Sequence, residues 1–220
     1  MKSNSHALTG AAALAMLLTA ACAPMMSGAR SGHMAAGSGA KAAELRAGLN
    51  TLLSEHVLLA ADATGAALGG RDEEFKAAAT ALDANSVSIS KAIGSVYGPD
   101  AEAAFLPLWR KHIGFVVDYT VGLATKDKAK QTKAVNDLVG YTEDFGAFLS
   151  SANPNLPKNA VAELVKGHIL TLKDVIDAQA AKDYGKAYSA LRTAAGHMQM
   201  IAAPLADAIV KQFPDRFVGM

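Results

Sequence analysis

Four histidines are the residues of this sequence best suited to hold a metal ion. His56, His112 and His168 recur at a constant interval of 56 residues, and His197 follows them. Neutral imidazole is a common ligand of zinc and copper. Each of the first three follows a leucine by four residues, which on a helix places the histidine on an apolar face. We therefore expect all four to face the interior, as ligands of zinc or copper or as structural core residues bonded to backbone or carboxylate groups.

The acidic residues near these histidines do not complete a site. Asp62, Asp118 and Asp174 each lie six residues after a repeated histidine, so the two side chains point about 120° apart on a helix and cannot bind one ion. We expect these aspartates to bond a neighbouring helix or face solvent. The sequence also lacks the Glu-x-x-His, Cys-x-x-Cys-His, Gly-x-Ser-x-Gly and phosphate-loop motifs. We therefore expect a protein that is not an enzyme.

The interval between the histidines belongs to an internal repeat. Three gapless copies begin at Leu49, Phe105 and Val161, and each contains two stretches with apolar residues at helical spacing, separated by a short polar break. Breaks this short make neighbouring helices antiparallel. The sequence thus predicts an all-α fold over residues 41–217, with six main helices forming three repeated antiparallel helical hairpins, either as a helical bundle or as a short array.

The arrangement of the hairpins decides what the histidines can do. A bundle closed around a pseudo-threefold axis would bring His56, His112 and His168 together, whereas hairpins stacked in an open row would keep them too far apart for one ion. The third copy departs from the other two at His197 and Pro204. We therefore expect an open or irregular arrangement in which at most two of the four histidines come within ligand range.

The N-terminus has the features of an export signal. Residues 1–21 carry one charge, Lys2, and a short apolar run that ends in small residues before Cys22, the only cysteine. This pattern is typical of a signal peptide with a lipidated cysteine, and plain secretion after an Ala-x-Ala site at Ala21 and Ala23 is the alternative. Residues 22–40 are rich in Gly, Ala and Ser and predict a flexible tether. We expect a lipoprotein anchored to the membrane by its N-terminal lipid, on the periplasmic side of the outer membrane in a Gram-negative cell.

The charge and cysteine content exclude other classes of protein. Cleavage before Cys22 removes Lys2, one of 21 basic residues, and leaves 20 basic and 20 acidic residues without a basic cluster. Such a neutral domain is a poor binder of nucleic acid. A single cysteine also rules out an intrachain disulfide, so stability must come from helix packing.

Several segments resemble a known protein family. The stretch Phe148–Lys158, which contains FLSSANPN, and the ending Ile209–Phe217, which contains KQFPDRF, carry the similarity together with Glu55-His56 and residues 196–198. These segments resemble a family of uncharacterised exported bacterial helical proteins, and the similarity runs from about Leu45 to Phe217.

This chain departs from the family pattern at two places. Leu58 and Leu59 stand where the family has a tryptophan soon after the first histidine, and Tyr141 stands where the family tends to have asparagine. The resemblance implies an exported helical domain, but it implies no activity. We expect a cell-envelope lipoprotein with a non-catalytic binding or interaction role, holding a metal or small ligand among its core histidines. The alternative is a structural or protein-interaction module that binds a partner in the envelope.

Overall fold

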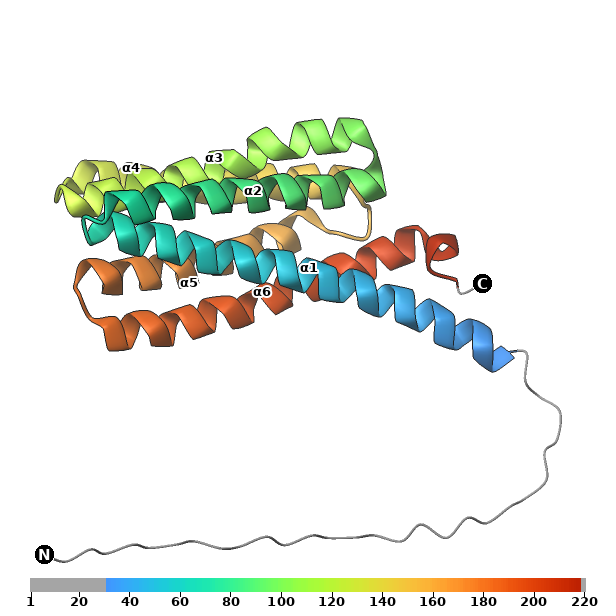
Figure 1. The fold of residues 1–220 in the computed structure, drawn as a ribbon. Coiled ribbons are helices and arrows are strands. Elements are labelled where there is room, and N and C mark those ends of the chain that lie inside the picture. The colour runs from blue at the N-terminus through green and yellow to red at the C-terminus, as the bar shows by residue number, and fades with distance from the viewer. Residues whose placement is uncertain (1–30, 219–220) are drawn as a thin grey trace, which may run out of the picture.

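The computed structural model describes residues 31–218, and within this range it is all-α, as the sequence predicts (Figure 1). No strand occurs among these residues. The helices are α1 (Ser31–Leu68), α2 (Asp72–Tyr97), α3 (Pro99–Ala124), α4 (Lys128–Ala152), α5 (Lys158–Ala180) and α6 (Tyr184–Gln212), followed by the short 3-10 helix η1 (Pro214–Phe217). Over residues 31–218, no helix combines the length and apolar character needed to cross a membrane.

The start of α1 differs from the predicted tether. The predicted signal peptide (residues 1–21) and Cys22 lie outside the described residues. The predicted tether reaches Ala40, whereas α1 begins at Ser31 and includes residues 31–40. Residues 31–40 contain as many glycines as alanines, so their own helix propensity is low, and the helix extends backwards through them because they are continuous with its packed part.

The hairpin turns repeat at the predicted interval. The second helices of the hairpins begin at Asp72, Lys128 and Tyr184, each 56 residues after the last. Before each start, one residue adopts a left-handed conformation: Gly70 (φ 67°), Lys126 (φ 56°) and Lys182 (φ 58°). A left-handed residue after a helix allows the amide of the following residue to donate a hydrogen bond to a carbonyl in the last turn of that helix. The three turns therefore share one backbone conformation, which makes the helices of each hairpin antiparallel.

Side-chain caps start two of these second helices. The Asp127 carboxylate accepts a hydrogen bond from the Lys130 amide at 2.9 Å, and the Asp183 carboxylate accepts one from the Lys186 amide at 3.0 Å. Such caps satisfy amide groups that the helix itself leaves without a partner. At the first hairpin, Arg71 has no side-chain cap.

The six helices close into a ring. Each helix packs against its neighbours in the sequence, and α6 also packs against α1, as Figure 1 shows for the crossing of these two helices. The first helices of the hairpins, α1, α3 and α5, also contact one another across the ring. The expectation of an open or irregular array is therefore wrong. The sequence departures at His197 and Pro204 are accommodated within α6 and do not prevent closure.

The core lies along the axis of this ring. Its largest fully buried side chains include Phe105 from α3, Tyr141 from α4 and Met198 from α6. Because α1, α3 and α5 surround the axis, equivalent positions of the three repeats face the same central space. This arrangement directs the three repeated histidines toward that central space.

Candidate metal centre

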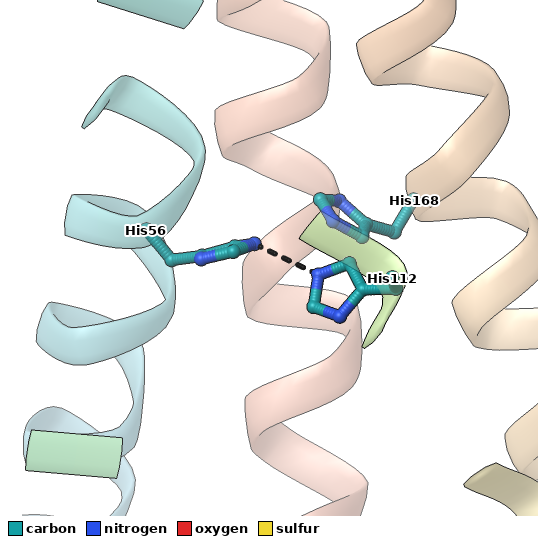
Figure 2. A group of neighbouring side chains, drawn as sticks. All are labelled: His56, His112 and His168. Atoms are coloured by element: carbon teal, nitrogen blue, oxygen red, sulfur yellow. Dashed lines mark hydrogen bonds between the residues drawn. The ribbon is translucent and has the colours of Figure 1, made fainter. Parts of the chain in front are cut away.

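The three repeated histidines meet at the centre of the bundle. His56 comes from α1, His112 from α3 and His168 from α5, and they are only 1%, 3% and 6% exposed. Figure 2 shows the three rings extending from separate helices toward a common space. One ring nitrogen of each lies within 4.8 Å of the others. The expectation that at most two histidines would come within ligand range is wrong, because ring closure brings equivalent positions together.

The spacing of these nitrogens suits a metal ion. The Nε2 atoms of His56 and His112 are 3.4 Å apart. This contact is a long hydrogen bond, marked by the dashed line in Figure 2. The distance is close to the separation of about 3.3 Å between two ligand atoms of a tetrahedral ion with bonds of about 2 Å. Three atoms within 4.8 Å of one another share a point at most about 2.8 Å from each. Small rotations of the rings would bring all three nitrogens to bonding distance.

Burial keeps these imidazoles neutral. It lowers the pKa of His112 to about 3 and the pKa of His168 to about 4. Burial also lowers the pKa of His56 well below its ordinary value, and His112 and His168 nearby lower it further. At pH 7 each ring therefore carries one N–H group and one free lone pair, which is the form that binds a metal ion.

The second nitrogen of each ring lacks a partner. The Nδ1 atoms of His56, His112 and His168 are buried and have no hydrogen-bond partner in the described part of the chain. Buried polar atoms of proteins almost always have a partner, because leaving one without costs about 1–3 kcal/mol. Three such atoms in one place distinguish this cluster from an ordinary hydrogen-bonded core.

Two aromatic residues with polar atoms complete the cluster. The ring of Trp109 lies 4.9 Å from that of His56 and 4.7 Å from that of His112. The ring of Tyr141 stacks on His112 at 5.0 Å. Within residues 31–218, neither Trp109 Nε1 nor the Tyr141 hydroxyl finds a hydrogen-bond partner. The cluster therefore contains five buried polar atoms without a partner.

Sequence reasoning did not select Trp109 and Tyr141, although the repeat could have indicated both. Trp109 precedes His112 by three residues and therefore lies on the same face of its helix. Tyr141 shares a repeat position with Asn85 and His197, which are both polar.

His197 lies outside this cluster and contacts a backbone carbonyl instead. Its Nε2 atom lies 2.9 Å from the Leu164 carbonyl oxygen. At the equivalent position of the first repeat, the Asn85 side-chain amide donates to the Leu52 carbonyl at 3.0 Å. Both side chains thus tie the second helix of a hairpin to the first. His197 therefore contacts a backbone carbonyl, and it is not one of the three histidines whose ring nitrogens converge.

The repeated aspartates also lie away from the cluster. Asp62 and Asp174 are exposed, and Asp118 forms an ion pair with Lys130 at 3.0 Å. These positions agree with the prediction that they face solvent or a neighbouring helix. Over residues 31–218, the group of possible ligands at this place consists of the three imidazoles and includes no carboxylate.

A small apolar cavity of about 70 Å³ adjoins all three histidines. Its lining includes Trp109, Tyr141 and the Met198 thioether, and it contains no charged side chain. Repeat positions from all three copies supply most of its wall: Leu49, Phe105, Val161, Leu53, Val165, Ile89, Phe145, Ile201, Ile93, Leu149 and Leu205. The cavity therefore lies on the pseudo-threefold axis.

A second cavity of about 250 Å³ reaches the cluster from another side. It lies between α1, α2 and α3 and is lined by His56 and His112 together with Thr64, Thr120 and Asp72. His168 does not line it. The cluster thus separates a small apolar space from a larger and more polar one.

Comparison with known proteins found no relative of this chain. No protein-family model, no curated protein and no solved structure matches the chain. What can be concluded about the centre therefore comes from its own geometry: three buried histidines lie close enough together to hold one metal ion.

Proposed function

We propose that this chain is a cell-envelope lipoprotein with a non-catalytic role, which holds one transition-metal ion among His56, His112 and His168. One observation carries the proposal: one ring nitrogen from each of three buried, neutral imidazoles lies within 4.8 Å of the others. Metal binding would use the converging lone pairs. It would also fix the proton of each ring on the nitrogen that does not bind the ion.

Zinc and copper are the two candidate ions, and the surroundings favour copper(I). The cost of removing an ion from water rises with the square of its charge, so a singly charged ion is easier to bury than a doubly charged one. The cavity beside the histidines has no charged side chain to compensate a second charge. Met198 also lines this cavity, and thioether is a soft donor that suits copper(I).

The envelope location rests on the N-terminal sequence. The apolar run before Cys22 and the absence of any other cysteine support export and lipidation. A lipid at Cys22 would hold the helical domain beside the membrane. An ion-binding domain in that place would sequester or carry the ion within the envelope.

The alternative is a structural or interaction module in which the histidines only support the core. His197 favours this alternative, because it demonstrates that the chain uses one histidine as a tie between helices. The convergence of the other three histidines argues against it, since supporting histidines would be expected to bond to separate backbone or carboxylate groups rather than to face one another.

Metal titration of the purified protein tests the proposal. A chain lacking residues 1–22 retains every described residue and removes the competing thiol. We expect it to bind one equivalent of copper(I), measured anaerobically against a chromophoric chelator, and to bind zinc more weakly. His112→Leu and His168→Leu should each weaken copper binding by about tenfold or more, because a two-histidine site remains.

His197→Asn is the matched control. Asparagine at the equivalent position of the first repeat already bonds to the equivalent carbonyl, so this variant should fold and bind copper like the parent chain. Circular dichroism establishes that all variants are folded. Absence of stoichiometric binding, or binding that the two His→Leu variants leave intact, would contradict the proposal and favour the structural module.

A further inference from the structure

The larger of the two cavities lies at one of three equivalent junctions between hairpins. Each junction, here called a seam, is formed by the turn end of one hairpin and the first helix of the next, and the seams are numbered by the first of these hairpins. The cavity of about 250 Å³ lies in the first seam. The repeat relates the linings of the three seams, with Ala63, Tyr119 and Val175 at one position and Val117, Lys173 and Ala61 at another.

Side chains fill the second seam at the place where the first seam is open. Tyr119 is buried there, and its hydroxyl donates to the Asp177 carboxylate at 2.6 Å. Lys173 donates to the same carboxylate at 2.6 Å. In the first seam Ala63 stands at the position of Tyr119, so no ring occupies that space. The hollow that remains at the second seam is lined by charged residues and by no histidine.

The third seam is closed by a side chain that bridges two helices. The Gln179 amide donates to the Ala61 carbonyl at 2.9 Å, and its oxygen accepts from the Thr64 hydroxyl at 2.9 Å. A Cβ atom added at Gly65 would lie 3.0 Å from Gln179 Nε2, so α1 and α5 approach closely. The hollow at this seam is lined by charged residues, among them Asp62, Arg71 and Glu74. Of the three seams, the first is therefore the one whose cavity is mainly apolar and reaches the histidines.

The lining and the volume of the first-seam cavity suit an apolar molecule. Its walls consist of three alanines and of Phe75, Leu82, Ile113, Val116, Val117, Val121 and Leu172, with few polar groups. Water is a poor occupant of such a space because it needs about two to four polar partners. An empty apolar space also costs stability, since its walls lose contacts. A cavity of about 150 Å³ binds benzene, so about 250 Å³ accommodates about ten nonhydrogen atoms.

The polar groups of the cavity favour a ligand that donates hydrogen bonds. The Thr64 hydroxyl donates to Gln179 and the Thr120 hydroxyl donates to the Val116 carbonyl at 2.8 Å, so both hydroxyls offer only lone pairs to a ligand.

The mouth of the cavity carries a negative charge. Val117 and Val121 are 42% and 41% exposed, which places them where the cavity meets solvent. Asp72, which is also exposed, is the only charged residue of the lining. A carboxylate at the mouth favours a cation and disfavours an anion such as a fatty acid.

We propose that the first seam binds one small, mainly apolar molecule of about ten nonhydrogen atoms that carries a single amino group. Its apolar part lies in the cavity beside Ala63 and Phe75. Its ammonium group lies at the mouth beside the Asp72 carboxylate, where it stays hydrated. The site is independent of the metal centre: the Nδ1 atoms of His56 and His112 are buried and their Nε2 atoms contact each other, so the ligand needs no bond to either ring or to an ion.

Phenethylamine is a probe of this size and charge. Phenethyl alcohol has a hydroxyl in place of the amino group, and hydrocinnamate has a carboxylate. The chain used for the metal titration is freed of metal with a chelator, and each compound is titrated into it by isothermal calorimetry. We expect one phenethylamine per chain with a dissociation constant on the order of 100 µM. The alcohol should bind about two- to fivefold more weakly, because an exposed ion pair contributes little, and hydrocinnamate should bind most weakly.

One variant fills the cavity. Ala63→Phe places a ring where the second repeat has Tyr119, so the repeat tolerates an aromatic residue at this position. It should weaken the binding of both the amine and the alcohol by about tenfold or more, because the space is occupied. Ala180→Leu is the matched control, since it adds volume at the second seam, where the first repeat already has Leu68. This control should bind both compounds like the parent chain.

Two variants change the charge at the mouth. Asp72→Asn should lower the affinity for phenethylamine to that for the alcohol and leave the affinity for the alcohol unchanged. Val117→Lys introduces at an exposed position the residue that the second seam has as Lys173, so it should fold. It should weaken the binding of the amine more than that of the alcohol.

Each outcome bears on one part of the proposal. A folded parent chain that binds neither the amine nor the alcohol would overturn the site, as would an Ala63→Phe variant that folds and binds like the parent. Equal affinity for all three compounds would overturn the amino group, as would amine binding that neither Asp72→Asn nor Val117→Lys weakens. Circular dichroism establishes folding, and if Ala63→Phe does not fold, Val117→Lys still decides. Because these titrations contain no metal, their failure leaves the copper proposal standing, and a failure to bind copper leaves this site standing.

Discussion

Acidification should destabilise the metal-free protein at pH values well above those at which carboxylates titrate. His112 and His168 have pKa values of about 3 and about 4 in the folded chain because they are buried, whereas an unfolded histidine has a pKa of about 6.5. Between these values the unfolded chain binds protons that the folded chain does not. Folding stability is therefore fully present above about pH 6.5 and is lost as the pH falls toward about 4 and then 3.

The size of the loss follows from the same pKa values. At pH 5 an unfolded histidine gains about 2 kcal/mol from proton binding, which a folded histidine of pKa about 3 or about 4 does not gain. His112 and His168 together should therefore lower the free energy of unfolding by about 4 kcal/mol between pH 7 and pH 5. Burial shifts the pKa of His56 in the same direction, so it adds to this loss. The total free energy of unfolding of most domains is only about 5–15 kcal/mol.

Urea unfolding followed by circular dichroism at pH 7, 6 and 5 measures this dependence. His112→Leu should remove about 2 kcal/mol of the change between pH 7 and pH 5, since one proton-binding group disappears. His168→Leu serves as a second, independent case with the same expected sign. A free energy of unfolding that stays within about 1 kcal/mol from pH 7 to pH 5 would refute the reasoning, because histidines that titrate normally in the folded chain give no such change.

Four further predictions concern the anchor and the packing. Cys22→Ser should move the protein from the membrane fraction to the soluble fraction of the cell, and a parent protein that is already soluble would contradict lipidation. Gly146→Ala should destabilise the fold in thermal unfolding, because the new Cβ would lie 2.7 Å from the Lys158 carbonyl oxygen. Gly140→Ala, where nothing lies within 4 Å, should stabilise it by about 0.5–1 kcal/mol. Ala134→Leu should cost about 1–3 kcal/mol in urea unfolding, since Ala134 is 1% exposed and the added volume has no space.

The helices and their pairing could be predicted from the sequence because they depend on local patterns. The repeat interval and the polar breaks predict six helices, and the hairpin turns recur at Gly70, Lys126 and Lys182. Closure of the ring depends instead on packing between α1 and α6, which are far apart in the chain and have no local signal. Lys126 and Lys182 also show that a repeated turn keeps its conformation where glycine is replaced.

The candidate site was predictable in its residues but not in its geometry. His56, His112 and His168 were selected by their shared repeat position, yet their convergence follows only from the closed ring. The different role of His197 could not be read from residue type, because it depends on the position of the Leu164 carbonyl across the hairpin. Tyr141 occupies the same repeat position and turns its ring onto His112 instead.

Closure of the ring between the first and last helices has a consequence for the order of folding. Hairpins of neighbouring helices involve short loops and can form early, whereas α1 and α6 meet through contacts such as the ion pair of Arg46 with Asp207, which are 161 residues apart in the chain. Contacts between distant segments form slowly because a long loop must first be closed. The three histidines come from three hairpins, so we expect the complete cluster to exist only after this late step. An ion that binds all three would join the hairpins to one another and slow the reopening of the ring, so its release would follow the rate at which α1 separates from α6.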